Sequence, residues 1–570
     1  MATDNTPSVA FDLKTPRSIA DRYVDELVEL DPRISTALGV RPHEDRVPDL
    51  SPAGQQAQDE LASRTLADLG RAEAAAGPDG LDPIEARCAA VLRERLTSAL
   101  AMSAADEPLR PIRNIFGPAQ AVRGLFSMMP TETDEDWAAV GRRMARVPQA
   151  YRSHVESLEL GRSKGVFSAP RQVAALIEQL DEWVAGKRSW FHEVVADGPS
   201  AQRAELDAAA GKAASGVREL RGYLAATYLP AAEGTPDAVG ADRYRVTSRA
   251  STGADLDLEE AYAWGWAEYR RLDAEMRSAA EIVLPGSSPL EAMEHLDREG
   301  EAVQGAEAVR DRLQQMMDTA IDDLQGTHFD IADPIRRVEA MIAPPGSAAA
   351  PYYTRPSMDF SRPGRTWLPT LGRDTFPLWE LVSTWYHEGV PGHHLQLAQW
   401  VHVAPQLTVF QTSVGSNSAC TEGWALYAER LMDELGYLDV PARMGYLDAQ
   451  IMRAIRVVID IGMHLELEVP GDSPVGAGKR WTPALAREFF GAHSGRSGAF
   501  LDSEVVRYLG WPGQAISYKL GERAWLAGRD AAQDRHRGQG RELDLKAWHM
   551  SALSMGSLGL DDLARELGAL

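Results

Sequence analysis

Helical periodicity runs through nearly the whole chain and is the feature that most limits its fold. Near the start, Ile19, Tyr23, Leu27 and Leu30 recur on one side of a helix, and similar segments fill residues 16–325. With 570 residues, the chain can bury one large core or about two to three smaller ones. These patterns predict a mainly α-helical protein built from many helices.

The periodicity is interrupted once, between about residues 326 and 372. The segments IRRVEAMIAPP, APYYTRPS and RTWLPTL are β-branched or aromatic and are separated by Pro and Gly, as strands of a small sheet are. Helical spacing returns with FPLWELVSTWYHEG and continues to the last residue. We therefore expect a small β-sheet directly before that helix.

This pattern predicts three parts of the chain. Residues 1–15 are polar and contain proline, so we expect them to be disordered. Residues 16–325 form a helical region that we expect to supply one wall of a channel. Residues 326–570 hold the small sheet, the candidate metal-binding helices and the C-terminal helices. In the first region, Ser51 followed by Pro52 predicts a helix start.

The net charge and the cysteine content restrict the partners and metal ligands that we expect. The net charge of -24 is spread along the chain, which argues against nucleic acid or an anionic membrane as a partner. Cys88 and Cys420 are the only cysteines, so a metal would need His and carboxylate ligands. The first 30 residues lack a secretory pattern and no apolar run reaches about 18 residues, so we expect a cytoplasmic protein.

The stretch YHEGVPGHHLQ, residues 386–396, concentrates candidate metal ligands. His387 and Glu388 fall on one side of the preceding helix. In the common zinc protease helix, two histidines at i and i+4 bind one ion, and a Glu next to the first histidine acts as base. Here Pro391 occupies i+4, so the spacing departs from that pattern.

A bulge would restore a second histidine ligand. Gly389, Pro391 and Gly392 can break the helix, and a two-residue bulge would bring His393 back to the side of His387. His394 faces that side of an ideal helix but lies about 10 Å further along it. We favour His393 and keep His394 as the alternative. A Gly-Pro turn with hydrogen-bonding histidines and no metal is the competing interpretation.

A third ligand is available about thirty residues later. In zinc sites with two His and one Glu, that Glu comes from a following helix, and SNSACTEGWALYAERL supplies Glu422. With Ser418 as the expected N-cap, Glu422 lies one position past a capping-box partner. Glu429 lies seven residues later on the same face, where it either supports a metal ligand or, as we favour, is a solvated charge. The predicted ligand set for Zn²⁺ is His387, His393 and Glu422.

A polar stripe follows on the next helix, whose other sides are apolar. Arg453, Arg456, Asp460 and His464 cluster on one side of DAQIMRAIRVVIDIGMHLEL. A buried stripe of this kind either forms internal salt bridges or lines a cavity that faces the metal. Further on, Tyr518 is a candidate to polarise a substrate carbonyl, although tyrosines at such positions commonly serve packing.

These motifs resemble a known bacterial family. YHEGVPGHHLQ, TEGWALYAERL, RVVIDIGMH and PGQAISYKLGE, in this order, look like the family of domain of unknown function 885 (DUF885), and the likeness spans almost the whole chain. The resemblance implies a large multi-helix fold akin to zinc carboxypeptidases and oligopeptidases. It implies a zinc-dependent hydrolase, with the metal and base roles falling on His387, Glu388, His393 and Glu422.

We therefore expect a zinc metallopeptidase that cleaves short peptides. Glu388 would be the general base, Tyr518 or His464 would steady the oxyanion, and Arg453 or Arg456 would bind a substrate carboxylate. The alternatives are a zinc-dependent hydrolase or lyase for a small metabolite, and a non-catalytic binding protein. Glu388 argues against the last, because a structural site needs no base. A homodimer is one assembly that the sequence allows.

Overall fold

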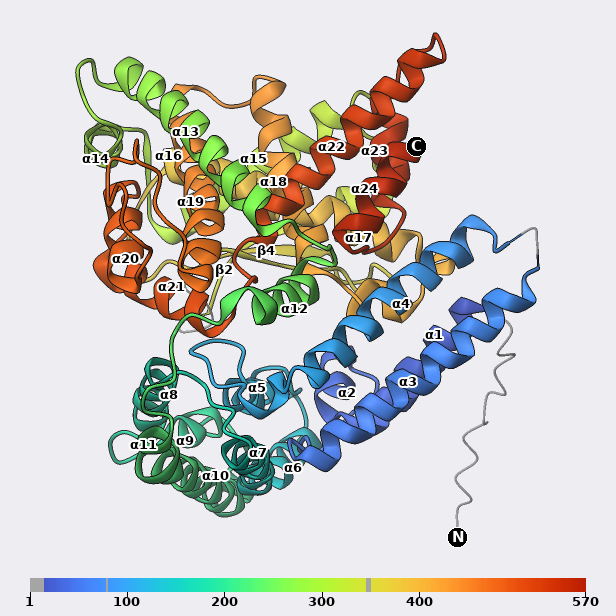
Figure 1. Ribbon diagram of the computed structural model, residues 1–570, viewed down its shortest axis with the longest axis vertical. Coiled ribbons are helices and arrows are strands. Elements are labelled where there is room, and N and C mark those ends of the chain that lie inside the picture. The colour runs from blue at the N-terminus through green and yellow to red at the C-terminus, as the bar shows by residue number, and fades with distance from the viewer. Residues whose placement is uncertain (1–14, 78–79, 345–349) are drawn as a thin grey trace. The chain divides into compact units, whose positions relative to one another are not determined.

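The computed structural model describes residues 15–77, 80–344 and 350–570, which fall into two compact units. Unit 1 comprises the described residues up to Val239 together with Val506–Trp511, and unit 2 comprises Gly240–Val505 and Pro512–Leu570. Unit 1 runs from blue to dark green in Figure 1, apart from its short C-terminal segment, and unit 2 runs from brighter green to red.

The division between the units comes earlier in the chain than the sequence predicts. The predicted boundary after residue 325 falls inside unit 2, because the long helix α13 (Leu258–Val283) packs along α19 (Val440–Leu465). The predicted disordered segment 1–15 lies outside the described residues except for Thr15. The Thr15 side chain caps the first helix.

The described residues of unit 1 form helices joined by loops, with no strand among them. Several begin with a proline in the first turn, and Ser51 caps α3 as predicted, with its side chain accepting from the Gly54 amide. The α-helices are α1 (Pro16–Leu30), α2 (Pro32–Leu38), α3 (Pro52–Ala75), α4 (Pro83–Ala104), α5 (Pro118–Gly124), α6 (Asp134–Met144), α7 (Val147–Ser163), α8 (Pro170–Trp183), α9 (Trp190–Val194), α10 (Arg203–Tyr223) and α11 (Leu229–Ala231).

The core of unit 1 forms where α10 packs against α6, α7, α8 and α9. Val140, Leu158, Leu180 and Val217, one from each of four of these helices, are fully buried there. Their spacing is the helical periodicity of the sequence, so burial of one apolar face per helix accounts for this part of the fold.

Unit 2 is also mainly helical. Besides α13 and α19 it contains α12 (Gly240–Thr252), α14 (Pro289–Glu299), α15 (Ala306–Leu324), α16 (Leu378–Glu388), α17 (His393–His402), α18 (Ser418–Glu434), α20 (Pro483–Ala492), α22 (Ser517–Gly538), α23 (Leu545–Leu553) and α24 (Leu560–Ala569). Helix α21 (Gly498–Gly510) begins in unit 2 and ends in unit 1. No described helix is long and apolar enough to cross a membrane.

Two small sheets precede the helix α16. Strands β2 (Val338–Ile342), β4 (Gly364–Leu368) and β3 (Tyr352–Thr354) form one sheet in that order, with β2 parallel and β3 antiparallel to β4. Strand β1 (Ala302–Gln304) pairs antiparallel with β5 (Thr375–Pro377), which leads directly into α16. The prediction of a mainly helical protein with a small sheet before this helix is confirmed.

Helices α18 and α22 of unit 2 pack closely against each other. A Cβ atom on Gly423 would lie 2.4 Å from the backbone carbon of Gly521, so only glycine allows the two backbones to meet. Helix α22 also packs along α24, beside it in Figure 1. This contact brings the motifs TEGWA and SYKLGE, almost 100 residues apart, into one site.

Candidate metal centre

A tight turn joins α16 to α17 and carries the segment GVPG. The Gly392 amide donates to the carbonyl of Tyr386, 3.0 Å away and six residues earlier, where a regular helix bonds residues four apart. The two extra residues match the predicted insertion, but α16 ends at Glu388 and α17 begins anew at His393. The predicted bulge within one helix is therefore corrected to a break between two helices.

Gly392 and Trp424 hold this turn in place. A Cβ atom on Gly392 would lie 2.0 Å from the carbonyl oxygen of His387, so a larger residue would push the turn open. The Trp424 indole donates to the carbonyls of Pro391, at 3.0 Å, and of Gly392, at 3.2 Å. The buried Trp424 of the motif TEGWA thus stabilises the turn, which positions His393.

The turn brings His387, His393 and Glu422 together. The two imidazole rings lie 4.7 Å apart at 83°. Glu422 Oε2 lies 3.4 Å from His387 Nε2 and 3.8 Å from His393 Nε2. Ligands at about 2.0–2.1 Å from a tetrahedral zinc ion are separated by about 3.3 Å. The three atoms are therefore close to the arrangement that one zinc ion needs.

Glu388 is a second carboxylate beside the same histidines. One ligating atom each of His387, Glu388 and His393 lies within 4.8 Å of the others, so this trio could also hold an ion. However, Glu388 Oε1 lies 4.0 Å from His387 Nε2, farther than Glu422 does. The shorter distances favour Glu422 as the ligand and leave Glu388 free to contact water.

The pKa values of Glu388 and Glu422 favour the same assignment as the distances do. Burial raises the pKa of Glu388 to about 8. Burial acts on Glu422 as well, but the contact with His387 and the nearby His393 outweigh it and lower its pKa to about 2. A metal ligand must be deprotonated, whereas a general base works best with a pKa near neutrality. Glu422 suits the first role and Glu388 the second.

The pKa values of His387 and His393 also differ. Burial opposes a charge on His387, yet its contacts with Glu422 and Glu429 raise its pKa to about 10. Burial and the adjacent His387 lower the pKa of His393 to about 4. His393 is therefore neutral at physiological pH. A metal ion would have to displace the proton shared by His387 and the carboxylates, as an incoming cation does at a carboxylate-lined site.

Glu429 contacts His387, so the favoured prediction of a solvated charge is wrong and the alternative, a residue that supports a candidate ligand, fits its contacts. Its side chain is 1% exposed, and Oε1 lies 2.7 Å from His387 Nδ1. Ser383 donates to its other oxygen at 2.9 Å. With a carboxylate at Nδ1, Nε2 is the ring nitrogen that faces Glu422, as in many zinc sites. Asn417, rather than the predicted Ser418, caps the helix that carries these acids.

Lys519 and Gln450 extend this network and were not identified from the sequence. Gln450 donates to Glu429 at 3.3 Å and accepts from the fully buried Lys519 at 2.6 Å. Lys519 also forms ion pairs with Glu268, at 3.0 Å, and with Glu522. In the sequence, Lys519 directly follows the candidate Tyr518, but nothing in the pattern of α22 marks it as buried.

Both ring nitrogens of His394 contact groups outside the candidate metal centre. Its Nε2 lies 2.6 Å from the carbonyl oxygen of Ile335, and its Nδ1 lies 3.0 Å from the hydroxyl of Tyr353 on β3. Its side chain is fully buried between α17 and the three-stranded sheet. One ring nitrogen thus binds the short helix Asp333–Arg336 before β2 and the other binds β3, which favours His393 over His394 as the ligand.

The polar stripe of α19 divides into two parts. Arg453 NH2 lies 3.4 Å from Glu429 Oε1, and its Nε and NH1 atoms are buried without a hydrogen-bond partner among the described residues. Arg456 donates to Glu504 at 2.7 Å and stacks over the ring of Tyr518. Arg453 therefore borders the candidate metal centre with donors to spare, whereas Arg456 has a carboxylate partner of its own.

Further along the stripe, Asp460 and His464 bind neighbouring segments. Asp460 accepts from the Tyr244 hydroxyl at 2.6 Å and from the Gly513 amide at 2.9 Å. His464 packs against the ring of Tyr244 and lies eleven residues beyond Arg453, about 16 Å along the helix. The contacts of Asp460 and His464 fit internal order better than a role at the candidate metal centre.

Tyr518 is half-buried at the start of α22. Its ring lies under the Arg456 guanidinium, with 5.2 Å between the guanidinium carbon and the ring centroid. It precedes Lys519, which reaches Glu429 through Gln450. Of the two predicted oxyanion donors, Tyr518 thus lies next to a residue of the network around the candidate metal centre, whereas His464 lies about 16 Å along α19 from Arg453.

Comparisons with known proteins show the family and the fold of this chain. The family model described as "Bacterial protein of unknown function (DUF885)" matches residues 32–567. A "putative lipoprotein" from Colwellia psychrerythraea superposes with a TM-score of 0.80 at 20% identity, covering 97% of this chain and 98% of that one. A "putative lipoprotein of unknown function" from Shewanella oneidensis gives 0.73 at 17% identity, covering 97% and 99%.

Among curated proteins, none is matched by this chain. The two solved structures share less than a quarter of their residues with it, so they establish the fold alone. The family model covers nearly the full length. The chain belongs to the DUF885 family.

Proposed function

We propose that this chain is a zinc-dependent hydrolase, and specifically a metallopeptidase acting on short peptides. The observation that supports the proposal is the short distance of two histidine nitrogens from one carboxylate oxygen. Glu422 Oε2 lies 3.4 Å from His387 Nε2 and 3.8 Å from His393 Nε2. Two imidazoles and one carboxylate form the donor set of many catalytic zinc sites, which keep a further position open.

The surrounding residues support the fit to zinc. Glu429 accepts at His387 Nδ1, so that the opposite nitrogen is available to the ion. A zinc ion in such a site acts as a Lewis acid and makes water a nucleophile at neutral pH. Glu388 would accept the proton of the attacking water and return it to the leaving amine. Tyr518 remains the proposed donor to the oxyanion.

Arg453 supports the choice of a peptide substrate. Its guanidinium lies beside Glu429 and has two buried nitrogen atoms without partners among the described residues. A planar carboxylate matches two parallel N–H donors of arginine. A free C-terminus bound there would place a nearby peptide bond at the candidate metal centre, which favours exopeptidase action on short peptides.

The experiment has a metal arm and an activity arm. Elemental analysis of the purified full chain should find about one zinc per chain, and His387→Ala, His393→Ala and Glu422→Gln should each lose most of it. His402→Ala, an exposed histidine at the end of the same helix, is the matched control and should keep the metal. Metal retained in all three ligand variants would refute the site.

The activity arm uses zinc-loaded protein and a library of short peptides read by mass spectrometry. Glu388→Gln should keep zinc and fold but lose about 10²-fold or more of the turnover, because an amide cannot accept the proton of water. Turnover unchanged in this variant would contradict the mechanism. Zinc binding with no cleavage of any peptide would instead favour a small-metabolite substrate for the same site.

A further inference from the structure

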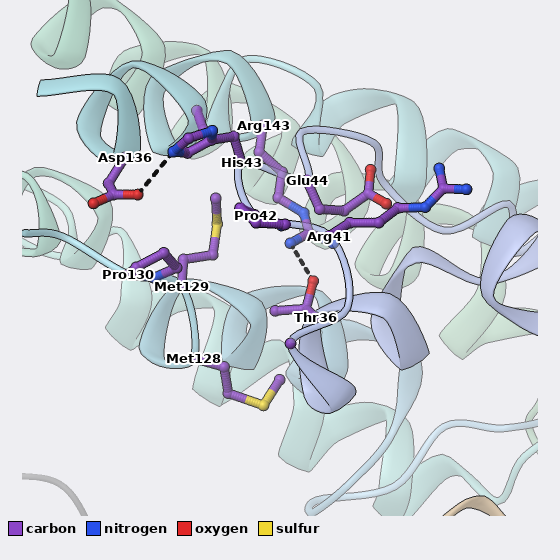
Figure 2. Close-up of a pocket in the computed structure, with 12 residues that line it drawn as sticks. Thr36, Arg41, Pro42, His43, Glu44, Met128, Met129, Pro130, Asp136 and Arg143 are labelled. Atoms are coloured by element: carbon purple, nitrogen blue, oxygen red, sulfur yellow. Dashed lines mark hydrogen bonds and ion pairs between the residues drawn. The ribbon is translucent and has the colours of Figure 1, made fainter. Parts of the chain in front are cut away.

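Unit 1 contains a cavity that none of the features above explains. Its volume is about 260 Å³, and it opens where the loop after α2 meets the start of α6 (Figure 2). The lining residues are Thr36, Gly39, Arg41, Pro42, His43, Glu44, Met128, Met129, Pro130, Asp136, Ala139 and Arg143. A cavity of this size suits a small molecule rather than a peptide.

Most charged groups around the cavity have partners of opposite charge. Arg41 pairs with Glu29, and Glu44 binds Arg46 at 2.7 Å. Asp136 lies 3.1 Å from His43 Nε2, a contact that Figure 2 marks with a dashed line. These groups therefore need no ligand to balance them.

Arg143 is the exception. Its side chain is 0% exposed, and no carboxylate of the described residues lies within 4.0 Å of its guanidinium. It donates to Thr36 Oγ1 at 2.7 Å, the second dashed line in Figure 2, and to the Pro32 carbonyl at 3.2 Å. Its Nε has no hydrogen-bond partner among the residues that the structure describes. Two of its five N–H groups are thus used, and the buried charge forms no ion pair within 4.0 Å among the described residues, although Glu44 acts on it from farther away.

The rest of the wall is apolar. Met128, Met129, Pro42, Pro130 and Ala139 surround the cavity. Met128 is 50% exposed, whereas Met129 is buried, so the methionines extend from the surface to the interior. Methionine side chains are flexible and adapt to apolar ligands of different shape. An occupant would therefore combine an apolar body with one group that balances Arg143.

We propose that this cavity binds a small monocarboxylate with an apolar body, its carboxylate facing Arg143. The guanidinium offers planar donors that match a carboxylate, and the methionines and prolines cover the apolar part. Glu44 and Asp136 also line the cavity and would repel a second negative charge, so a monoanion is preferred over phosphate. The site lies wholly within unit 1 and is independent of the proposed zinc chemistry.

The test follows the methionine methyl groups of the full chain by NMR, with 4-methylpentanoate as the probe. Saturable shifts of the Met128 and Met129 signals, assigned with Met→Leu variants, are expected. 4-Methylpentanamide, which has the same shape without the charge, should bind at least about tenfold more weakly. Equal binding of acid and amide, phosphate binding as tight as that of the acid, or no saturable shift would each overturn the proposal.

Two variants and a matched control locate the charge. Arg143→Met should weaken binding of the acid about tenfold or more. Arg142→Met removes the same charge from the next position of α6, where the side chain is exposed and pairs with Asp45, and should leave binding unchanged. If Arg143→Met fails to fold, Met128→Glu at the exposed rim places a negative charge at the mouth and should weaken binding equally. Unchanged binding in the folded variants would refute the site.

Discussion

At the scale of single residues, Arg453 and Arg456 separate substrate binding from internal order. Arg453→Met should lower kcat/KM about 10- to 100-fold for peptides with a free C-terminal carboxylate, because two charge-assisted hydrogen bonds are lost. Peptides with an amidated C-terminus should be affected much less. Steady-state kinetics on matched acid and amide substrates measure the difference.

Arg456→Met is the matched control on the same face of α19. Its guanidinium is already bound to Glu504, so its loss should lower stability and leave the ratio between acid and amide substrates unchanged. Zinc content must stay constant in the Arg453 variant, since that side chain also touches Glu429. An equal loss on both substrate types would assign Arg453 to the support of Glu429 instead.

The residues of the candidate site differ in how far the sequence could predict them. His387, Glu388, His393 and Glu422 lie in two short motifs whose residue types suggest zinc chemistry, and the structure brings them together. Glu429 could be placed on the right face, but periodicity alone does not tell a buried acid from a solvated one. Gln450 and Lys519 could not be predicted, because they join the network through the packing of three separate helices.

At the scale of elements, the turn between α16 and α17 should control metal binding. Gly392→Ala would place a Cβ atom 2.0 Å from the His387 carbonyl and 2.4 Å from that of Tyr386. Both obstacles are backbone atoms, so the turn must shift and carry His393 away from Glu422. We expect lost zinc and a melting temperature lowered by several degrees, checked by elemental analysis and differential scanning calorimetry.

Gly211→Ala in α10 is the control for this substitution. A Cβ atom there meets nothing within 4 Å, and alanine favours a helix over glycine by about 1 kcal/mol. That variant should keep its zinc and be as stable as the wild type or more so. Normal zinc content in Gly392→Ala would show that the turn tolerates movement and that the close contacts do not position His393.

Some helices and strands could be predicted from the sequence and others could not. The long helices and the strands β2, β3 and β4 were predicted from periodicity, β-branched residues and the Pro and Gly between them. Strands β1 and β5 were missed, because β1 lies within the long helical region and β5 leads directly into α16, so the helical spacing on either side hides them. The break at GVPG was predicted as an insertion, but its form depends on Trp424, which is more than 30 residues away.

At the scale of the whole molecule, each unit buries a histidine that burial keeps neutral. Burial lowers the pKa of His154 in unit 1 to about 4. The pKa of His549 in unit 2 falls to about 3, again chiefly through burial. Both lie below the ordinary value near 6.5, so the unfolded chain binds protons that the folded chain excludes. Acid should therefore destabilise both units.

These pKa values give the direction of the pH dependence of stability and the pH range in which it appears. Above pH 6.5 neither state is protonated at these positions, so their effect on stability is constant. As the pH falls from about 6.5 to about 4, each histidine should lower the free energy of unfolding by at most about 1.4 kcal/mol per pH unit. Urea unfolding of the chelator-treated protein at a series of pH values measures this slope without interference from metal binding.

His154→Gln separates this contribution from other acid effects. Its side chain is 1% exposed on α7, with no partner for Nε2 among the described residues, so glutamine removes the titration without breaking a bond of that atom. The variant should unfold with a shallower pH dependence between pH 4 and 6.5, whereas His402→Gln at an exposed position should keep the wild-type slope. Identical slopes in both variants would mean that unit 1 admits a proton at His154 without unfolding, and that acid acts on the molecule through other groups.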